Sequence, residues 1–253
     1  MKKIILLFAC IGFSSLSFAQ LELGVDGAFN TTWLFNNNVS DQGPNLNPNA
    51  SFGGSYGITG TFFLGKAIGI GAEINFNSVN QKYDGTVSSV SFNATDHLNY
   101  IQVPLMLKVK TQSGFYFELG PEFNFLSSAN GDLTSSPANS LADYSGKDIK
   151  TGLSNSVMGV VFGFGGRFPI TDHIGITAGL RFFGALGDAT TELGETDFAA
   201  DAAAGKLGVA ETFAHTDQSG NYRYQKTTIA TGGIQIGVFY ALFKNLKEEE
   251  SGK

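Results

Sequence analysis

Cysteine, proline and charged residues are all scarce in this chain. Its 253 residues include one cysteine, Cys10, and six prolines, and charged residues make up 15%. Cys10 lies in an N-terminal segment that we expect to be removed, so the mature chain would have no disulfide, thiolate metal ligand or cysteine nucleophile. Beyond that segment no run of about 20 apolar residues occurs, which excludes membrane-spanning helices.

The first residues, MKKIILLFACIGFSSLSFAQ, have the layout of a secretory signal peptide. Lys2 and Lys3 precede an apolar stretch over 4–13, and small residues before position 20 predict cleavage after Ala19. The apolar stretch is too short for a transmembrane anchor. A lipoprotein signal ending at Cys10 stays open as an alternative, although it would leave a very short apolar region.

Basic residues are also few. Without Lys2 and Lys3, sixteen Lys and Arg residues become fourteen, against twenty-two Asp and Glu. Phosphate binding needs a basic surface, so this acidic balance argues against nucleic acid as a partner.

Glycine and phenylalanine are abundant, with 33 and 23 residues, and they recur in segments that alternate between apolar and small or polar side chains. Alternation with period two indicates strands whose two faces meet different surroundings. Eight such segments are predicted: 21–30, 52–64, 68–81, 98–110, 115–126, 157–170, 174–187 and 227–243.

The connections between these segments alternate in length. Tight links at 65–67, 111–114 and 171–173 separate long polar segments at about 31–51, 82–97, 127–156 and 188–226. Short turns at one end and long loops at the other are typical of an up-and-down outer-membrane barrel. A soluble sandwich, the alternative, has no reason to sort its loops in this way.

The sequence therefore predicts an all-β, eight-stranded antiparallel transmembrane barrel with short periplasmic turns and long extracellular loops. Its expected organisation is a signal peptide over 1–19, the barrel domain over 20–243 and a short periplasmic tail over 244–253. Apolar side chains would face outer-membrane lipid, and the opposite face would line a lumen.

Charged residues on the inward face would make a poor sandwich core, because burying an unpaired charge is costly. They suit a narrow lumen filled by side chains. One lumen charge network is predicted, made of Glu73, Lys108, Glu118, Glu122, Arg167 and Arg181. One interpretation is structural, in which the network fills and stiffens the barrel. The alternative is functional: the network gates a narrow ion path, with Arg181 bridging two carboxylates.

Two prolines fall inside predicted strands, Pro104 and Pro121. Proline donates no ladder hydrogen bond, and a closed barrel has only central strands. We expect a bulge or ladder defect where the two prolines meet.

Four stretches resemble a known family: YIQVPLMLK, FYFELGPEFNFLSSA, GVVFGFGGRFPI and ITAGLRFFGALGD. They are similar to the small outer-membrane β-barrel domain common in Bacteroidetes, whose members are often called PorT-family proteins. The resemblance runs over about residues 21–243 and implies an outer-membrane barrel, usually of unassigned function. One branch of the family takes part in a secretion apparatus. The long segment 188–226 departs from a minimal barrel.

Catalytic and metal motifs are not apparent. His97, His173 and His215 are interpreted as surface histidines, with His173 at the opposite end of the barrel from the other two. No loop spacing places a nucleophile beside a base. We expect no enzymatic activity and no cofactor or metal site.

Loops carry function on rigid scaffolds, so partner binding would reside in the long loops. Trp33 and Leu34 are predicted as exposed loop contacts, and the alanine-rich stretch 197–208 is predicted as a short helix. The expected protein is a monomer of structural or interaction type that binds envelope proteins through its loops. A narrow gated pore and a component of a PorT-like secretion complex are the alternatives.

Overall fold

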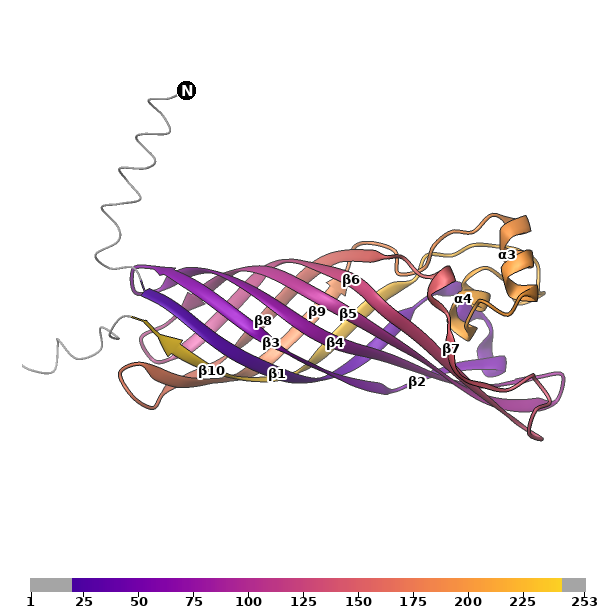
Figure 1. Cartoon of the computed structure of the whole chain (residues 1–253), viewed down its shortest axis with the longest axis horizontal. Helices are drawn as coiled ribbons and strands as arrows, with labels where there is room; N and C mark the ends of the chain where they lie inside the picture. The colour runs from indigo at the N-terminus through magenta and orange to yellow at the C-terminus, as the bar shows by residue number, and fades with distance from the viewer. Residues whose placement is uncertain (1–19, 243–253) are drawn as a thin grey trace, which may run out of the picture.

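The computed structural model describes residues 20–242, so the predicted signal peptide and the periplasmic tail lie outside the described residues. Eight antiparallel strands form a closed ring in chain order, because each pairs with its neighbours and the last pairs with the first (Figure 1). The strands are β1 (Gln20–Phe35), β3 (Ser51–Leu64), β4 (Ile68–Val87), β5 (Val90–Lys110), β6 (Phe115–Ser136), β8 (Ser156–Pro169), β9 (Ile174–Ala185) and β10 (Thr228–Ala241). The predicted fold class is confirmed.

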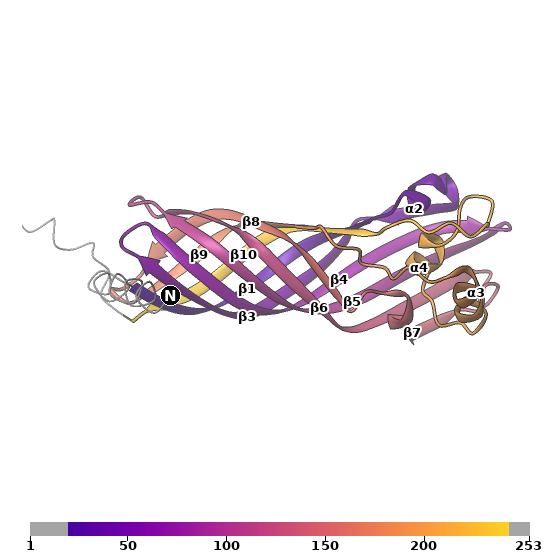
Figure 2. The same ribbon diagram turned by 90° about the horizontal axis from the view of Figure 1, so that it is seen from above.

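The two ends of the barrel differ as predicted. β1 begins and β10 ends at the end that carries the tight turns, the short-turn end (Figure 1). The opposite, long-loop end carries short elements that together form a cap (Figure 2). The elements of the cap are α2 (Asn37–Asp41), η2 (Gly43–Asn45), β2 (Leu46–Asn49), β7 (Tyr144–Asp148), η3 (Lys150–Gly152), α3 (Glu195–Ala203) and α4 (Val209–Ala214). α3 covers much of the helix predicted in 197–208. No helix within residues 20–242 is long and apolar enough to cross a bilayer.

One predicted loop is wrong. Residues 82–97 are not a loop, because β4 and β5 continue through them and pair to the end of both strands. Ser88 and Ser89 form the two-residue turn with φ of 50° and 66°, as a tight hairpin turn requires. β6 likewise runs on to Ser136. We call residues 78–98 and 127–136 the long-loop extension.

The prediction missed the extension because the meaning of the alternation reverses along a single strand. In the first part of β4, Ile74 and Phe76 are exposed while Glu73 and Asn75 are buried. Further along, Val79, Gln81 and Tyr83 point inward and the outward residues are polar. The outer face thus changes from apolar to polar at about residue 78.

The ladder defect predicted from the two prolines is confirmed. Pairing of β5 with β6 stops at Pro104 opposite Glu122 and resumes at Leu107 opposite Leu119, and β4 and β5 skip two pairs beside it. Gly120 fits this site because an added Cβ would lie 1.9 Å from the Leu105 carbonyl oxygen. A residue with a side chain would therefore force the two strands apart.

Candidate functional site

The centre of the lumen holds an ion-pair network from four strands. Arg181 on β9 contacts Glu73 on β4 (Nη1 to Oε2, 2.6 Å) and donates from Nε to Oε1 of Glu118 on β6 (2.8 Å). Lys108 on β5 reaches both carboxylates, with Nζ 3.0 Å from Glu73 and 3.2 Å from Glu118. Two cations thus balance two carboxylates, which is the arrangement that lets charges be buried.

Glycines on neighbouring strands make room for these side chains. Gly163 on β8 stands opposite Arg181 in the ladder, and an added Cβ there would lie 2.6 Å from Glu118 Oε1. A Cβ at Gly71 would lie 2.7 Å from Lys108 Cε. The glycine-rich inward faces are therefore shaped around the network.

A second charged cluster lies nearer the short-turn end. Arg167 at the end of β8 donates from Nη2 to both carboxylate oxygens of Glu22 (2.8 and 2.7 Å), and Lys110 Nζ lies 3.3 Å from the same carboxylate. The Arg167 guanidinium also lies over the Phe239 ring, with 4.2 Å to its centroid. Cations over aromatic faces are attracted by the ring quadrupole.

Four of the six predicted network residues are therefore in contact, and two are not. Arg167 belongs to the second charged cluster, because it lies on β8 four residues nearer the short-turn end than Gly163, which stands opposite Arg181. Glu122 lies on the other side of the network and accepts a hydrogen bond from Gln102 (2.9 Å). Glu22 and Lys110 were missed, since a lone charge near each strand end gave no partner at the sequence level.

A small cavity lies between the two charged clusters. The space that the centres of water molecules can occupy in it is about 50 Å³. The cavity is lined by side chains of both clusters, with Asp26 and Gln235 on its wall. One water needs about 10–15 Å³ by this measure, so the cavity accommodates a few waters.

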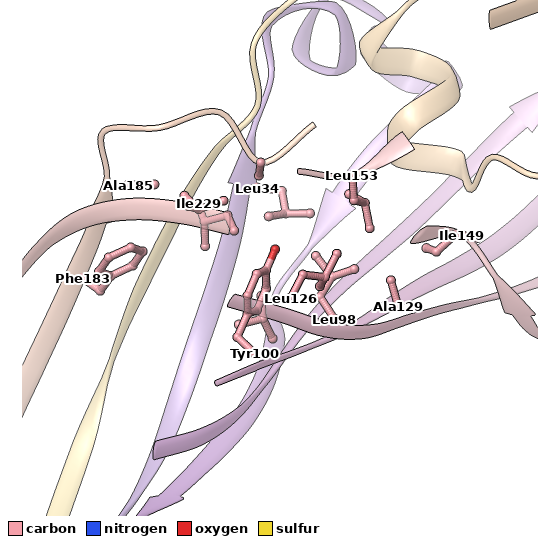
Figure 3. Close-up of a cluster of buried hydrophobic side chains, with 13 residues drawn as sticks. Leu34, Leu98, Tyr100, Leu126, Ala129, Ile149, Leu153, Phe183, Ala185 and Ile229 are labelled. Carbon is pink, nitrogen blue, oxygen red and sulfur yellow. The ribbon is translucent and has the colours of Figure 1, made fainter. Parts of the chain in front are cut away.

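An apolar cluster fills the barrel toward the long-loop end (Figure 3). It combines inward strand residues such as Leu98, Tyr100 and Phe183 with Ile149 and Leu153, which lie between β7 and β8. Ile149 and Leu153 are buried, so the connection from β6 to β8 packs into the mouth of the barrel instead of lying over it. Along the axis, the two charged clusters with the small cavity between them are thus followed by an apolar layer.

A buried amide joins parts of the cap to one another, and a second apolar cluster joins the cap to the strands. Asn38 on α2 donates to the carbonyl oxygens of Ala214 and Arg223 (3.1 and 2.6 Å), which links the first long connection to the last. α4 packs against the long-loop extension, where Val209 and Ala210 join Tyr83, Phe92 and other residues. The cap is therefore an ordered part of the fold.

The family described as outer membrane protein beta-barrel domain matches residues 17–190. The chain belongs to this family. Membership indicates the outer membrane as the location of this barrel, with the outward apolar faces of the strands toward lipid. The match carries no sign of the PorT group or of Bacteroidetes.

Several solved structures are similar to this outer-membrane barrel. Neisserial surface protein A has 13% identity and a TM-score of 0.38, over 88% of this chain and 97% of its own. Ail of Yersinia pestis, solved with a heparin analogue, has 9% identity and a TM-score of 0.36, over 88% and 99%. OprG of Pseudomonas aeruginosa has 12% identity and a TM-score of 0.42, over 87% and 95%. No function is transferred from them at these identities. No curated protein matches the chain in sequence.

The two predicted loop contacts lie in a strand, which corrects their placement. Trp33 and Leu34 belong to β1, which runs to Phe35. Because successive side chains in a strand point to opposite faces, Trp33 faces outward and is 40% exposed, whereas Leu34 faces the lumen and is 5% exposed. Leu34 is part of the apolar cluster in the barrel mouth.

The three histidines lie in separate surroundings. His97 contacts Asn80 and Asp132 on the outer face of the extension, and His173 Nδ1 donates to the Ala241 carbonyl oxygen at the short-turn end. The interpretation of His215 as a surface residue is wrong, because its side chain is fully buried. Its Nδ1 donates to the Glu211 carbonyl oxygen (2.7 Å), and its Nε2 lies 3.1 Å from the Leu193 amide nitrogen and 3.0 Å from the Thr191 carbonyl oxygen, so it fixes the end of α4 to the chain before α3.

Proposed function

We propose that this outer-membrane protein is a closed wall protein of structural or interaction type, whose function resides in its cap. The observation that carries the proposal is the apolar cluster in the barrel mouth, where Ile149 and Leu153 pack among inward strand residues. An ion entering this layer would exchange its hydration shell for apolar side chains and the Tyr100 hydroxyl of the cluster, which is costly. The ordered cap above it supplies a stable surface for an envelope protein partner.

Two further inferences accompany this proposal. The closed ring has no unpaired strand edge in its wall, which supports a monomer in outer-membrane lipid. The histidines supply no common site for catalysis, since each hydrogen-bonds to a different element. We therefore propose no enzymatic role.

Conductance in planar bilayers tests the proposal. The purified barrel should leave the membrane current at the lipid baseline at both polarities, while an open porin inserted in the same way conducts. Discrete conducting steps that grow in Arg181→Gln would overturn it. They would favour the narrow gated pore instead, because the small cavity beside Arg181 already provides part of a path.

A further inference from the structure

Two buried carboxylates meet where the cap joins the wall of the barrel. Asp96 is an inward residue of β5 in the long-loop extension, and Glu211 lies in the first turn of α4. Their exposed fractions are 1% and 0%. None of their four side-chain oxygens accepts a hydrogen bond of regular length and angle among residues 20–242, although the Ala210 and Gly208 amides lie near them. Burying two such groups without partners is costly if both are ionised.

Three glycines open the space that the two carboxylates occupy. A Cβ added at Gly208 would lie 2.4 Å from Glu211 Oε2 and 3.2 Å from Asp96 Oδ1, and the sum of these distances, 5.6 Å, is the most that can separate the two oxygens. Cβ atoms at Gly131 and Gly152 would meet Asp96 Oδ1 at 3.6 Å and Glu211 Cγ at 2.6 Å. The two carboxyl groups therefore face one small space bounded by β6, η3 and the start of α4.

The charged and titratable neighbours of the pair come from β7, β4, β5 and the residue after α4, and the β5 neighbour is the buried Tyr100, whose hydroxyl interacts with the charge of Glu211. Lys147 on β7 is half-buried and donates to the Leu207 carbonyl oxygen (2.9 Å), with its Nζ 4.3 Å from the Tyr144 ring centroid. Tyr144 and the buried Tyr83 on β4 also face the carboxylates. Burial raises the pKa of each tyrosine, and the charges of Asp96 and Glu211 raise it further. His215, directly after α4, uses its ring to contact backbone groups.

This set of neighbours favours a proton over a metal ion. One proton shared by Asp96 and Glu211 leaves a single negative charge, which Lys147 balances. A divalent cation would leave the site positive. No group of three or more His, Cys, Asp or Glu suited to a metal occurs among the described residues.

We propose that Asp96 and Glu211 form a proton-dependent latch, in which a shared proton seats α4 on the long-loop extension and its loss releases the cap. The latch concerns the cap as a conformational device. It holds whether or not the cap is the partner-binding surface argued above, and its test reads the position of α4, not conductance.

The raised pKa values of the two carboxyl groups agree with their burial side by side. Burial raises the pKa of Asp96 from 3.8 to about 7, against the opposing effects of the Ala210 amide and Lys147. Burial and, next, the charge of Asp96 raise the pKa of Glu211 well above its ordinary 4.5, against nearby backbone amides and Lys147. Interacting carboxyls titrate as a pair, so these shifts describe the seated pair together.

The sign of the pH dependence follows from these raised pKa values. A released pair returns to ordinary carboxyl values, so release loses at least one proton. The seated cap then has its full stability below about pH 4 and loses it progressively as the pH rises through about 7. Release would separate Val209 and Ala210 from the apolar cluster around Tyr83.

Hydrogen exchange of α4 tests the latch in the whole barrel, refolded in lipid nanodiscs. After correction for intrinsic exchange, protection over residues 208–216 should fall at least about tenfold per pH unit between pH 5 and pH 7, as linkage to one proton requires. Protection of the membrane part of β4, residues 68–77, should stay constant. A flat profile for α4 would overturn the proposal.

Paired variants separate the latch from a general effect of charge. Asp96→Asn with Glu211→Gln removes both titratable groups with little change in shape, and the slope should disappear. Glu195→Gln with Asp197→Asn removes two exposed carboxylates from α3 and should leave the slope intact. If the first pair prevents folding, as judged by loss of heat-dependent gel mobility, the wild-type profile and Glu211→Gln alone decide. Recovery of α4 protection at pH 8 by Ca²⁺ alone would overturn the latch in favour of a cation site.

Discussion

The membrane part of β4 and its continuation in the long-loop extension belong to one strand and alternate with the same period, yet they bury opposite kinds of residue. Over 68–77 the outward residues include Ile70, Ile74 and Phe76, and the inward ones include Glu73. Beyond residue 78 the inward residues include Tyr83, and the outward ones are polar. The apolar residues of β4 thus move from its outward face to its inward face at the point where the outer surroundings change.

The difference shows that the solvent outside, not the strand itself, decides which face is apolar. Lipid accepts apolar side chains and leaves the lumen to charges that must pair with one another. Water accepts polar side chains, so the interior of the extension becomes an ordinary apolar core with the cap packed into it. Buried charges in the first region are balanced by a network, whereas buried charges in the second are few and lie at the junction with α4.

The largest expected effect is the loss of the central cation in the membrane part. Arg181→Ala would leave Glu73 and Glu118 buried with Lys108 alone, and breaking a buried pair in this way costs about 3–5 kcal/mol. Urea unfolding in lipid vesicles measures the change in the free energy of unfolding. Arg223→Ala removes the same side chain from the exposed surface of the cap and should cost far less. Equal losses in the two variants would show that the lumen charges are not a mutually balanced network.

A charge placed on the outer face should have opposite consequences in the two regions. Ile74→Arg puts a cation against lipid and should destabilise the barrel by about 2–4 kcal/mol if residue 74 lies near the bilayer midplane. Thr86→Arg places the same side chain on the same face of β4 in the extension, where water surrounds it. It should leave the free energy of unfolding nearly unchanged. The two free energies of unfolding, measured in vesicles, should differ by most of the first value. Similar values would place both positions in the same solvent.

Much of this contrast could be predicted from sequence, and the missing part has a physical cause. Alternation such as that over 68–77 and the sorting of loop lengths predict the ring of eight strands and its outward apolar side, and Pro104 and Pro121 predict the ladder defect. The sequence predicts loops over 82–97 and 127–136 because the outward residues of the extension are mostly polar, so the apolar alternation that indicates a strand is absent there. Inward parity identified Glu73 and Arg181 as neighbours, since their strands carry opposite charges toward one lumen.

Contacts between segments far apart in the chain could not be predicted from the sequence. Asp96 and Glu211 are 115 positions apart, and only the folding of the last connection back onto β5 brings them together. His215 looked like a loop residue because nothing in its neighbours shows that α4 is buried beneath the rest of the cap. Arg167 has inward parity like Arg181, but its height along the barrel depends on strand register, which fixes its pairing with Glu22 instead.

A smaller effect is expected from the glycines that shape the lumen. Gly163→Ala places a methyl group 2.6 Å from Glu118 Oε1, so the carboxylate must shift away from Arg181, and overpacking of this kind costs about 1–3 kcal/mol. Gly184→Ala is the matched change one strand away, where an added Cβ meets nothing within 4 Å. Thermal unfolding of the two variants should separate them. A stable Gly163→Ala variant would mean that the network tolerates displacement.

The smallest effect is expected for a charge on the water-facing side of the extension. Asp132 accepts hydrogen bonds from the Ser145 hydroxyl and the Gly146 amide, and these lower its pKa. Its contribution is therefore present at neutral pH and is lost as the pH falls through the lowered value. Because Asp132 is solvent-exposed, Asp132→Asn should cost less than about 1 kcal/mol at pH 7. A loss as large as that of Arg181→Ala would contradict the distinction between the two regions.

A spin-label scan along β4 tests the central claim most directly, and a chain begun at Gln20 contains no other cysteine. Single cysteines at the outward positions between 70 and 86 would be labelled in lipid vesicles and probed with oxygen and with a water-soluble nickel complex. The account predicts that oxygen, which concentrates in lipid, relaxes the labels up to position 76, and that the nickel complex dominates from about position 80 onward. Labels that meet the nickel complex along the whole strand, or oxygen along the whole strand, would contradict an inversion at the membrane boundary.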